Sequence, residues 1–168
     1  MPPFVVAYVR FVDKLNYRVG RFSMYLLYVL MAILLWSSVS NILRQNAIWT
    51  LKMAQFTMVA YYMLGGPYSL QLDSNVRMDL LYGQWSDRKK AWVDAFSVFA
   101  LIFYLGVLLY GAVESTIYSL EYAERSATAW RPYIAPIKII MVVGIFLMLL
   151  QTITFFFRDV ARLRGEEL

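Results

Sequence analysis

Residues 139–157 read IIMVVGIFLMLLQTITFFF, a stretch with no charge and with one strongly polar side chain, Gln151. A helix needs roughly 20 apolar residues to cross a hydrocarbon core about 30 Å thick. A helix of a soluble domain would instead carry polar residues along the face that meets water. Three more uncharged, mostly apolar stretches lie at residues 22–43, 53–72 and 95–113. The sequence therefore predicts an all-α, polytopic membrane protein with four transmembrane helices in one membrane domain, residues 1–168.

The four stretches do not suit lipid equally well. Leu, Ile, Phe and Val each favour insertion by roughly 0.3 to 0.6 kcal/mol at a helix centre, so residues 139–157 should insert unaided. Residues 53–72 contain several polar side chains and the tripeptide Gly65-Gly66-Pro67. Proline removes one backbone hydrogen bond from a helix, and lipid offers no replacement. We therefore expect other helices to enclose residues 53–72; a lipid-facing helix with a kink is the alternative.

The first residues have an amphipathic pattern. Apolar side chains recur at intervals of three and four along one face of residues 4–21, and a basic stripe runs beside them. Such a helix suits the membrane interface, where each basic residue near anionic lipid contributes about 1 kcal/mol of attraction. We expect an N-terminal interfacial helix over residues 4–21; an extension of the first span is the alternative. The basic residues expected at the interface are Arg10, Lys14, Arg18 and Arg21.

The placement of charges predicts the orientation. With both termini inside, 11 of the 16 Lys and Arg residues lie in inner segments and 5 lie in outer ones. The positive-inside rule then places both termini in the cytoplasm. Tryptophan side chains flank the apolar stretches, at the headgroup level that indole rings favour. Those expected at the membrane interface are Trp49, Trp85 and Trp92.

Composition argues against several functions. The chain contains no Cys and no His, which excludes haem ligation by His, His/Cys zinc sites, Cys nucleophiles and Ser-His-Asp catalysis. We expect no enzyme, no cofactor and no metal site. The net charge of +5 reflects the topology and predicts no nucleic-acid partner. None of the four spans contains a charged residue, which disfavours an ion or substrate carrier.

Small and polar residues in and between the spans are candidates for contact with a partner protein. Glycines permit close approach of helices, and Gln151 can hydrogen-bond across them. Glu114 directly follows the third span; a solvated carboxylate is its alternative role. Arg77 and Asp79 could pair with each other or with a partner, although exposed pairs contribute only about 0–1 kcal/mol. The candidates are Gly65, Gly66, Pro67, Arg77, Asp79, Glu114, Trp130 and Gln151.

Three motifs resemble the small membrane subunit of tripartite ATP-independent periplasmic (TRAP) transporters. The first is GPYSL at residues 66–70 followed by NVRMD at residues 75–79. The second is SDRKKAWVD at residues 86–94. The third comprises Ser126, Trp130, Pro132, Pro136, Gly144, Leu150-Gln151 and Arg158. The resemblance spans roughly residues 41–162, and Asn75 stands where a His is common in the family.

The resemblance implies a division of labour in a bacterial inner membrane. A periplasmic substrate-binding protein captures an organic acid, commonly a carboxylate, and a large membrane subunit carries it with the coupling sodium ions. The small subunit packs against the large one and helps to receive the binding protein. Sodium ions are expected on the large subunit, with none on this chain. The alternatives are an autonomous small four-helix transporter or exporter, and a membrane anchor subunit of another complex.

Overall fold

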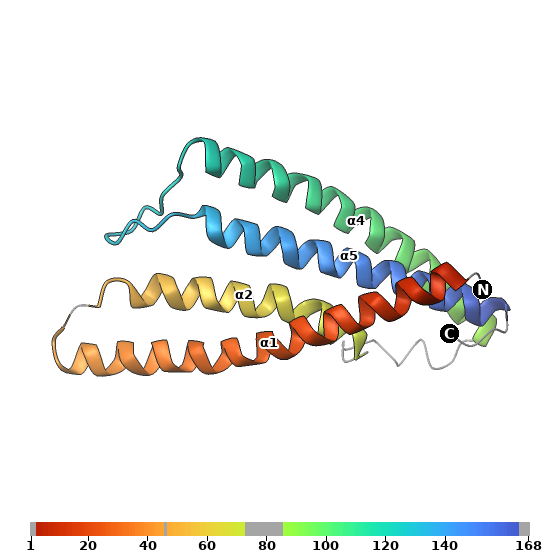
Figure 1. Cartoon of the computed structure of the whole chain (residues 1–168), viewed down its shortest axis with the longest axis horizontal. Coiled ribbons are helices and arrows are strands. Elements are labelled where there is room, and N and C mark those ends of the chain that lie inside the picture. Colours follow the sequence, from red (N-terminus) through yellow and green to blue (C-terminus); the bar gives the residue numbers. More distant parts are fainter. Residues whose placement is uncertain (1–2, 46, 73–85, 165–168) are drawn as a thin grey trace.

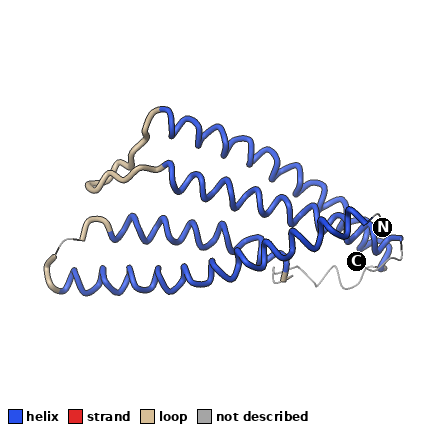
Figure 2. Tube along the Cα trace, viewed as in Figure 1, coloured by secondary structure: helices blue, strands red, loops and turns tan. Residues whose placement is uncertain are grey.

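Four long helices make up the part of the chain that the structure, a computed structural model, describes: residues 3–45, 47–72 and 86–164. They are α1 (Pro3–Ile42), α2 (Thr50–Gln71), α4 (Asp87–Glu121) and α5 (Ala135–Arg164). Within these residues the only extended pairing is one isolated bridge between Arg125 and Tyr133. Figure 2 shows helices joined by loops and turns. The all-α prediction is confirmed.

Three of the helices are long and apolar enough to cross a membrane. The segments are Pro3–Ile42, Trp92–Glu121 and Ala135–Ala161. The 22-residue helix α2 is not among them, because Gln, Tyr and Gly residues lower its hydropathy. The predicted multi-pass membrane protein is therefore supported by α1, α4 and α5, and the fourth predicted crossing corresponds to the least apolar helix.

Helix α1 differs from the expected pair of segments. An interfacial helix over residues 4–21 and a span over residues 22–43 were expected, but one helix of 40 residues runs through that boundary. No proline interrupts residues 4–42. The structure thus has the alternative arrangement, in which the first span extends toward the N-terminus. At 1.5 Å per residue, α1 is about 60 Å long, roughly twice the thickness of a hydrocarbon core.

The helices run alternately up and down, and α2 lies between α1 and α5 (Figure 1). Helix α4 packs extensively only against α5. The start of α1 and the end of α5 lie at the same end of the molecule. Helix α2 is shorter than α1 and ends beside the N-terminal half of α1, which continues across α5. Helices α1 and α5 cover two sides of residues 53–72, while Gln55, Met58 and Tyr62 remain exposed.

The C-terminal ends of α1 and α4, which lie opposite the chain termini, share the same backbone geometry. At the end of α1, Gln45 N donates to the Ser40 carbonyl at 2.9 Å, and Arg44 takes a φ of 56°. At the end of α4, Glu124 N donates to the Ser119 carbonyl at 3.1 Å, and Ala123 takes a φ of 46°. Both are Schellman-type ends, in which a left-handed residue lets the chain reverse and satisfies a terminal carbonyl.

The outer surface of the helices is apolar, whereas much of the buried interior is polar. Large exposed side chains cover the face of α4 that points away from α5, and they include Trp92, Phe96, Phe99, Phe103 and Tyr110. Soluble monomers rarely expose apolar patches of this extent. The completely buried side chains include Asn16, Gln151, Thr152 and Thr154. Apolar groups outside and polar contacts inside are what a lipid solvent favours.

Candidate functional site

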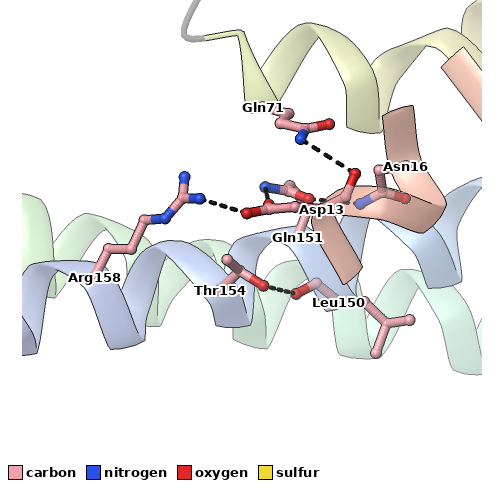
Figure 3. Close-up of polar contacts among 7 residues, drawn as sticks. All are labelled: Asp13, Asn16, Gln71, Leu150, Gln151, Thr154 and Arg158. Carbon is pink, nitrogen blue, oxygen red and sulfur yellow. Dashed lines mark hydrogen bonds and ion pairs between the residues drawn. The ribbon is translucent and has the colours of Figure 1, made fainter. Parts of the chain in front are cut away.

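A cluster of five polar side chains joins α1, α2 and α5 near the end of the molecule that carries the termini (Figure 3). We call this cluster the polar joint. Gln151 is its centre: it accepts a hydrogen bond from Asn16 Nδ2 at 2.6 Å and donates one to Asp13 Oδ1 at 3.2 Å. The members of the polar joint are Asp13 and Asn16 from α1, Gln71 from α2, and Gln151 and Arg158 from α5.

An ion pair closes the polar joint on one side. Arg158 Nη2 lies 2.5 Å from Asp13 Oδ2, with about a third of the Arg158 side chain and a fifth of the Asp13 side chain exposed. On the other side, Gln71 Nε2 donates to the main-chain carbonyl of Asp13 at 3.2 Å. Both carboxylate oxygens of Asp13 are therefore engaged, and its charge is matched by that of Arg158.

Helical spacing explains why these residues meet. Asp13 and Asn16 are three residues apart, and Gln151 and Arg158 are seven apart, so each pair shares one face of its helix. Asn16 is 1 % exposed and Gln151 is fully buried. Buried polar side chains such as these are stable because hydrogen bonds within the protein replace the ones they would make to water. Within the described residues, Asn16 Oδ1 and Gln71 Oε1 remain without a hydrogen-bond partner.

Neighbouring contacts fix the angle at which α1 crosses α5. Tyr8 donates its hydroxyl to the Leu150 carbonyl at 3.3 Å, and its ring packs edge-on against Phe157 with centroids 6.0 Å apart. Thr154 donates to the same carbonyl at 3.2 Å, within its own helix. The polar joint and this aromatic contact together bind the N-terminal half of α1 to the C-terminal half of α5.

The Gly65-Gly66-Pro67 tripeptide lies where α2 meets its two neighbours. Pro67 is buried inside α2 and lacks an N–H, so the carbonyl of Met63 loses its usual donor. Gly144 of α5 lies against that carbonyl: a Cβ at Gly144 would be 2.7 Å from the Met63 oxygen. The missing side chain lets the α5 backbone cover the freed carbonyl. This chain therefore encloses its own proline site.

Other glycines also serve contacts between helices of this chain. A Cβ at Gly66 would lie 3.3 Å from Met148 Sδ, and one at Gly65 would lie 3.5 Å from Ser23 Oγ. Gly20 is tighter still, since a Cβ there would lie 2.3 Å from Cγ of Tyr68. Small residues of α1, α2 and α5 thus allow the close backbone approach on which helix packing in lipid depends.

The remaining predicted residues lie on the surface or outside the described part. Glu114 is exposed on α4 and accepts a hydrogen bond from the Tyr110 hydroxyl at 2.7 Å. Trp130 is exposed in the α4–α5 connection. Arg77, Asp79 and Trp85 lie outside the described residues. The predicted interface residues that are exposed are Arg10, Lys14, Arg18, Arg21, Trp49 and Trp92.

Of the polar joint, Gln151 was predicted as a contact residue and Arg158 belongs to a family motif, whereas Asp13, Asn16 and Gln71 were not predicted as their partners. Asp13 was not predicted as a buried contact, because it lies outside every uncharged stretch. The structure nevertheless brings its carboxylate to Gln151, which lies within residues 139–157. One signal was present: Asp13 is the only acidic residue among the basic ones of residues 4–21. A lone acid beside a basic stripe is a candidate for pairing with a basic residue elsewhere in the chain.

The polar joint suits structural use more than chemistry. Among the described residues, no three His, Cys, Asp or Glu side chains come together to bind a metal ion. Asp13 is paired with Arg158 and hydrogen-bonded to Gln151, so neither oxygen is free for a substrate. What the arrangement can do is fix three helices relative to one another.

The fold defines an α-helical, multi-pass membrane protein whose interior contains a charge-balanced polar contact. The profile of the family "Tripartite ATP-independent periplasmic transporters, DctQ component" matches residues 30–162. The chain belongs to this family, and it is a small membrane component of a TRAP transporter. No curated protein and no solved structure matches the chain.

Proposed function

We propose that this chain is the rigid small subunit of a TRAP transporter and supports the large subunit that moves the substrate. The observation that carries the proposal is the polar joint, in which Asp13 and Arg158 neutralise each other between α1 and α5. A carrier needs polar groups that exchange partners, whereas a support needs groups whose bonds are already made. The glycine contacts at Gly20 and Gly144 add close packing to the same three helices.

In this proposal α2 is the fourth crossing, and both termini lie in the cytoplasm. Helix α2 is about 33 Å long at 1.5 Å per residue, enough to span a hydrocarbon core. Its position between α1 and α5 buries Thr57 and Pro67 and partly covers Gly65 and Gly66. The N-terminal part of α1 then extends to the cytoplasmic headgroups, where its exposed basic stripe, Arg10 to Arg21, attracts anionic lipid.

The proposed partners are a large membrane subunit, a periplasmic substrate-binding protein and the lipid of a bacterial inner membrane. The large subunit carries the organic acid, a carboxylate, together with sodium ions in symport, and this chain itself has no catalytic or cofactor role. The family membership supports a tripartite assembly. The exposed apolar face of α4 offers ample surface for lipid and for the large subunit.

Co-purification tests the proposal. With an affinity tag on this chain, the large subunit should be recovered in a fixed ratio from membranes of cells that express both. Gln151→Leu leaves Asp13 and Asn16 without their central partner, so recovery of the complex should fall with it. Lys14→Ala, which removes an exposed side chain one residue from Asp13, is the matched control. Full recovery with Gln151→Leu would contradict the supporting role of the polar joint.

A further inference from the structure

Helix α2 has one narrow exposed face along its length. The four exposed side chains of α2 recur at intervals of four, three and four residues, which puts them on a single face of the helix. The buried side chains of α2, such as Thr57 and Ala60, lie on the other side, and α2 packs against α1 and α5. We call the exposed set the α2 stripe; its members are Leu51, Gln55, Met58 and Tyr62.

In the proposed crossing, the α2 stripe lies at membrane depth. Counted from Thr50 at 1.5 Å per residue, Gln55 is about 8 Å and Tyr62 about 18 Å along a helix of about 33 Å. Tyr62 is therefore close to the middle of the hydrocarbon core. From Met63 to Gln71, no side chain of α2 is exposed. The α2 stripe thus occupies the half of the helix nearer the end of the molecule opposite the termini (Figure 1).

Two members of the α2 stripe carry groups that form hydrogen bonds. The Gln55 amide both donates and accepts, and Tyr62, which is 60 % exposed, carries a hydroxyl. Among the described residues, neither group has a hydrogen-bond partner. The Tyr62 ring packs edge-on against Tyr61, with centroids 5.3 Å apart. Lipid tails offer no hydrogen bonds, so an amide that faces them lacks any replacement for water.

The low hydropathy of α2 also favours a protein neighbour over lipid. Segments of α1, α4 and α5 are apolar enough to cross a membrane, whereas α2 is not among them. Helices α1 and α5 cover two sides of α2 and leave the α2 stripe open. The exposed phenylalanines of α4, such as Phe96, Phe99 and Phe103, suit lipid tails directly. The polar groups of α2 instead require a neighbour that offers hydrogen bonds.

We propose that a helix of the large membrane subunit packs along the α2 stripe and presents a hydrogen-bonding side chain to Gln55. This inference rests on the proposed function, which supplies the large subunit as a constant neighbour in the membrane. A helix fits because intervals of four, three and four residues form the seam that a neighbouring helix meets along its length. Hydrogen bonds between helices add to such packing in lipid. The family is tripartite, so a different membrane subunit fits better than a second copy of this chain.

Gln55→Leu distinguishes a protein neighbour from lipid. The apparent Kd between this chain and the large subunit is measured in detergent by fluorescence. Loss of the amide should weaken association by about three- to tenfold. The thermal stability of this chain alone should not fall, because leucine makes α2 more apolar. Gln45→Leu is the matched control, since Gln45 is exposed and lies beyond the end of α1; it should leave the Kd within about twofold of wild type.

Photo-cross-linking in membranes that contain the complete complex identifies the neighbour. A benzophenone amino acid in place of Met58 should form an adduct with the mass of this chain plus the large subunit. An adduct of two copies of this chain, or the absence of any adduct with the large subunit, would overturn the assignment. An unchanged Kd for Gln55→Leu would also overturn it, and an assembled complex would leave the supporting role intact. Failure of the wild-type subunits to associate would instead contradict the proposed function.

Discussion

At the scale of single residues, the fold depends on a few polar atoms that find one another inside an apolar shell. Asp13 and Arg158 are separated by most of the chain, yet their charged atoms meet at 2.5 Å. Removing one member leaves the other charge without its partner in a partly enclosed site, which costs more than the pair contributes. A double-mutant comparison can therefore separate the contact from its surroundings.

Asp13→Ala should lower the free energy of unfolding by about 1–3 kcal/mol, since Arg158 loses a charged hydrogen-bond partner. Arg158→Leu should cost a similar amount, and the double variant should cost less than the two single ones combined. Thermal unfolding of the purified protein in detergent gives these values. Lys14→Ala should change stability by no more than about 0.5 kcal/mol. Additive effects of the two changes would contradict the direct contact.

The second residue-scale prediction concerns Gly144. A Cβ there would meet the carbonyl oxygen and the Cβ of Met63 at 2.7 and 2.8 Å, so Gly144→Ala should cost about 1–3 kcal/mol by overpacking. Gly111→Ala is the control, because nothing lies within 4 Å of a Cβ at that position. It should stabilise α4 by about 0.5–1 kcal/mol through helix propensity. Equal effects of both substitutions on unfolding would contradict the close approach of α5 to α2.

The sequence predicts Gln151 as a contact residue but not Asp13 or Asn16, for a physical reason. Gln151 stands out because it interrupts an apolar run, and any such group in lipid must find a partner. Asp13 and Asn16 lie in an amphipathic segment, where polar residues need no special explanation. Only the crossing of α1 over α5 turns them inward. That crossing depends on long-range packing, which periodicity along one helix does not encode.

At the scale of helices, hydropathy predicts where the apolar spans lie better than it predicts where the helices begin and end. The stretches 22–43, 53–72, 95–113 and 139–157 all lie within observed helices, apart from one or two terminal residues. Each helix nevertheless extends past its apolar stretch at one end or both. Charged residues end a membrane span without ending a helix, because the backbone bonds of a helix are satisfied on either side of the interface. Residues 4–21 and α1 illustrate this difference.

A distance measurement tests the continuity of α1. Spin labels at Ala7 and Ala32, both exposed, are separated by 25 residues, or about 37 Å along a straight helix. A right-angle bend between residues 21 and 22 would shorten this to about 27 Å at the same rise per residue. We expect the longer distance from pulsed electron paramagnetic resonance of the protein in nanodiscs. A distribution centred on the shorter one would restore a separate interfacial helix.

At the scale of the whole molecule, the arrangement of helices predicts the topology. Alternating directions place the start of α1 and the end of α5 at one end, with the connection between α4 and α5, residues 122–134, at the other. The proposed cytoplasmic location of that end rests on the excess of basic residues in the segments expected inside.

Reporter fusions after Arg21, Trp49, Lys90, Arg125 and Arg164 should therefore alternate between inside and outside, beginning and ending inside. This expectation follows from the proposed crossing of the membrane by α2, which packs between α1 and α5 despite its low hydropathy. Alkaline phosphatase and green fluorescent protein provide complementary reports of the two sides. A periplasmic signal at Lys90 would contradict the crossing by α2.

Reconstitution into liposomes tests the supporting role most directly. Uptake of an organic acid driven by a sodium gradient should require this chain, the large subunit and the binding protein together. This chain alone should give no uptake, because its partly buried charges, Asp13 and Arg158, are already paired with each other. Full uptake with the large subunit and the binding protein but without this chain, or uptake by this chain alone, would contradict its role as the rigid support of the transporter.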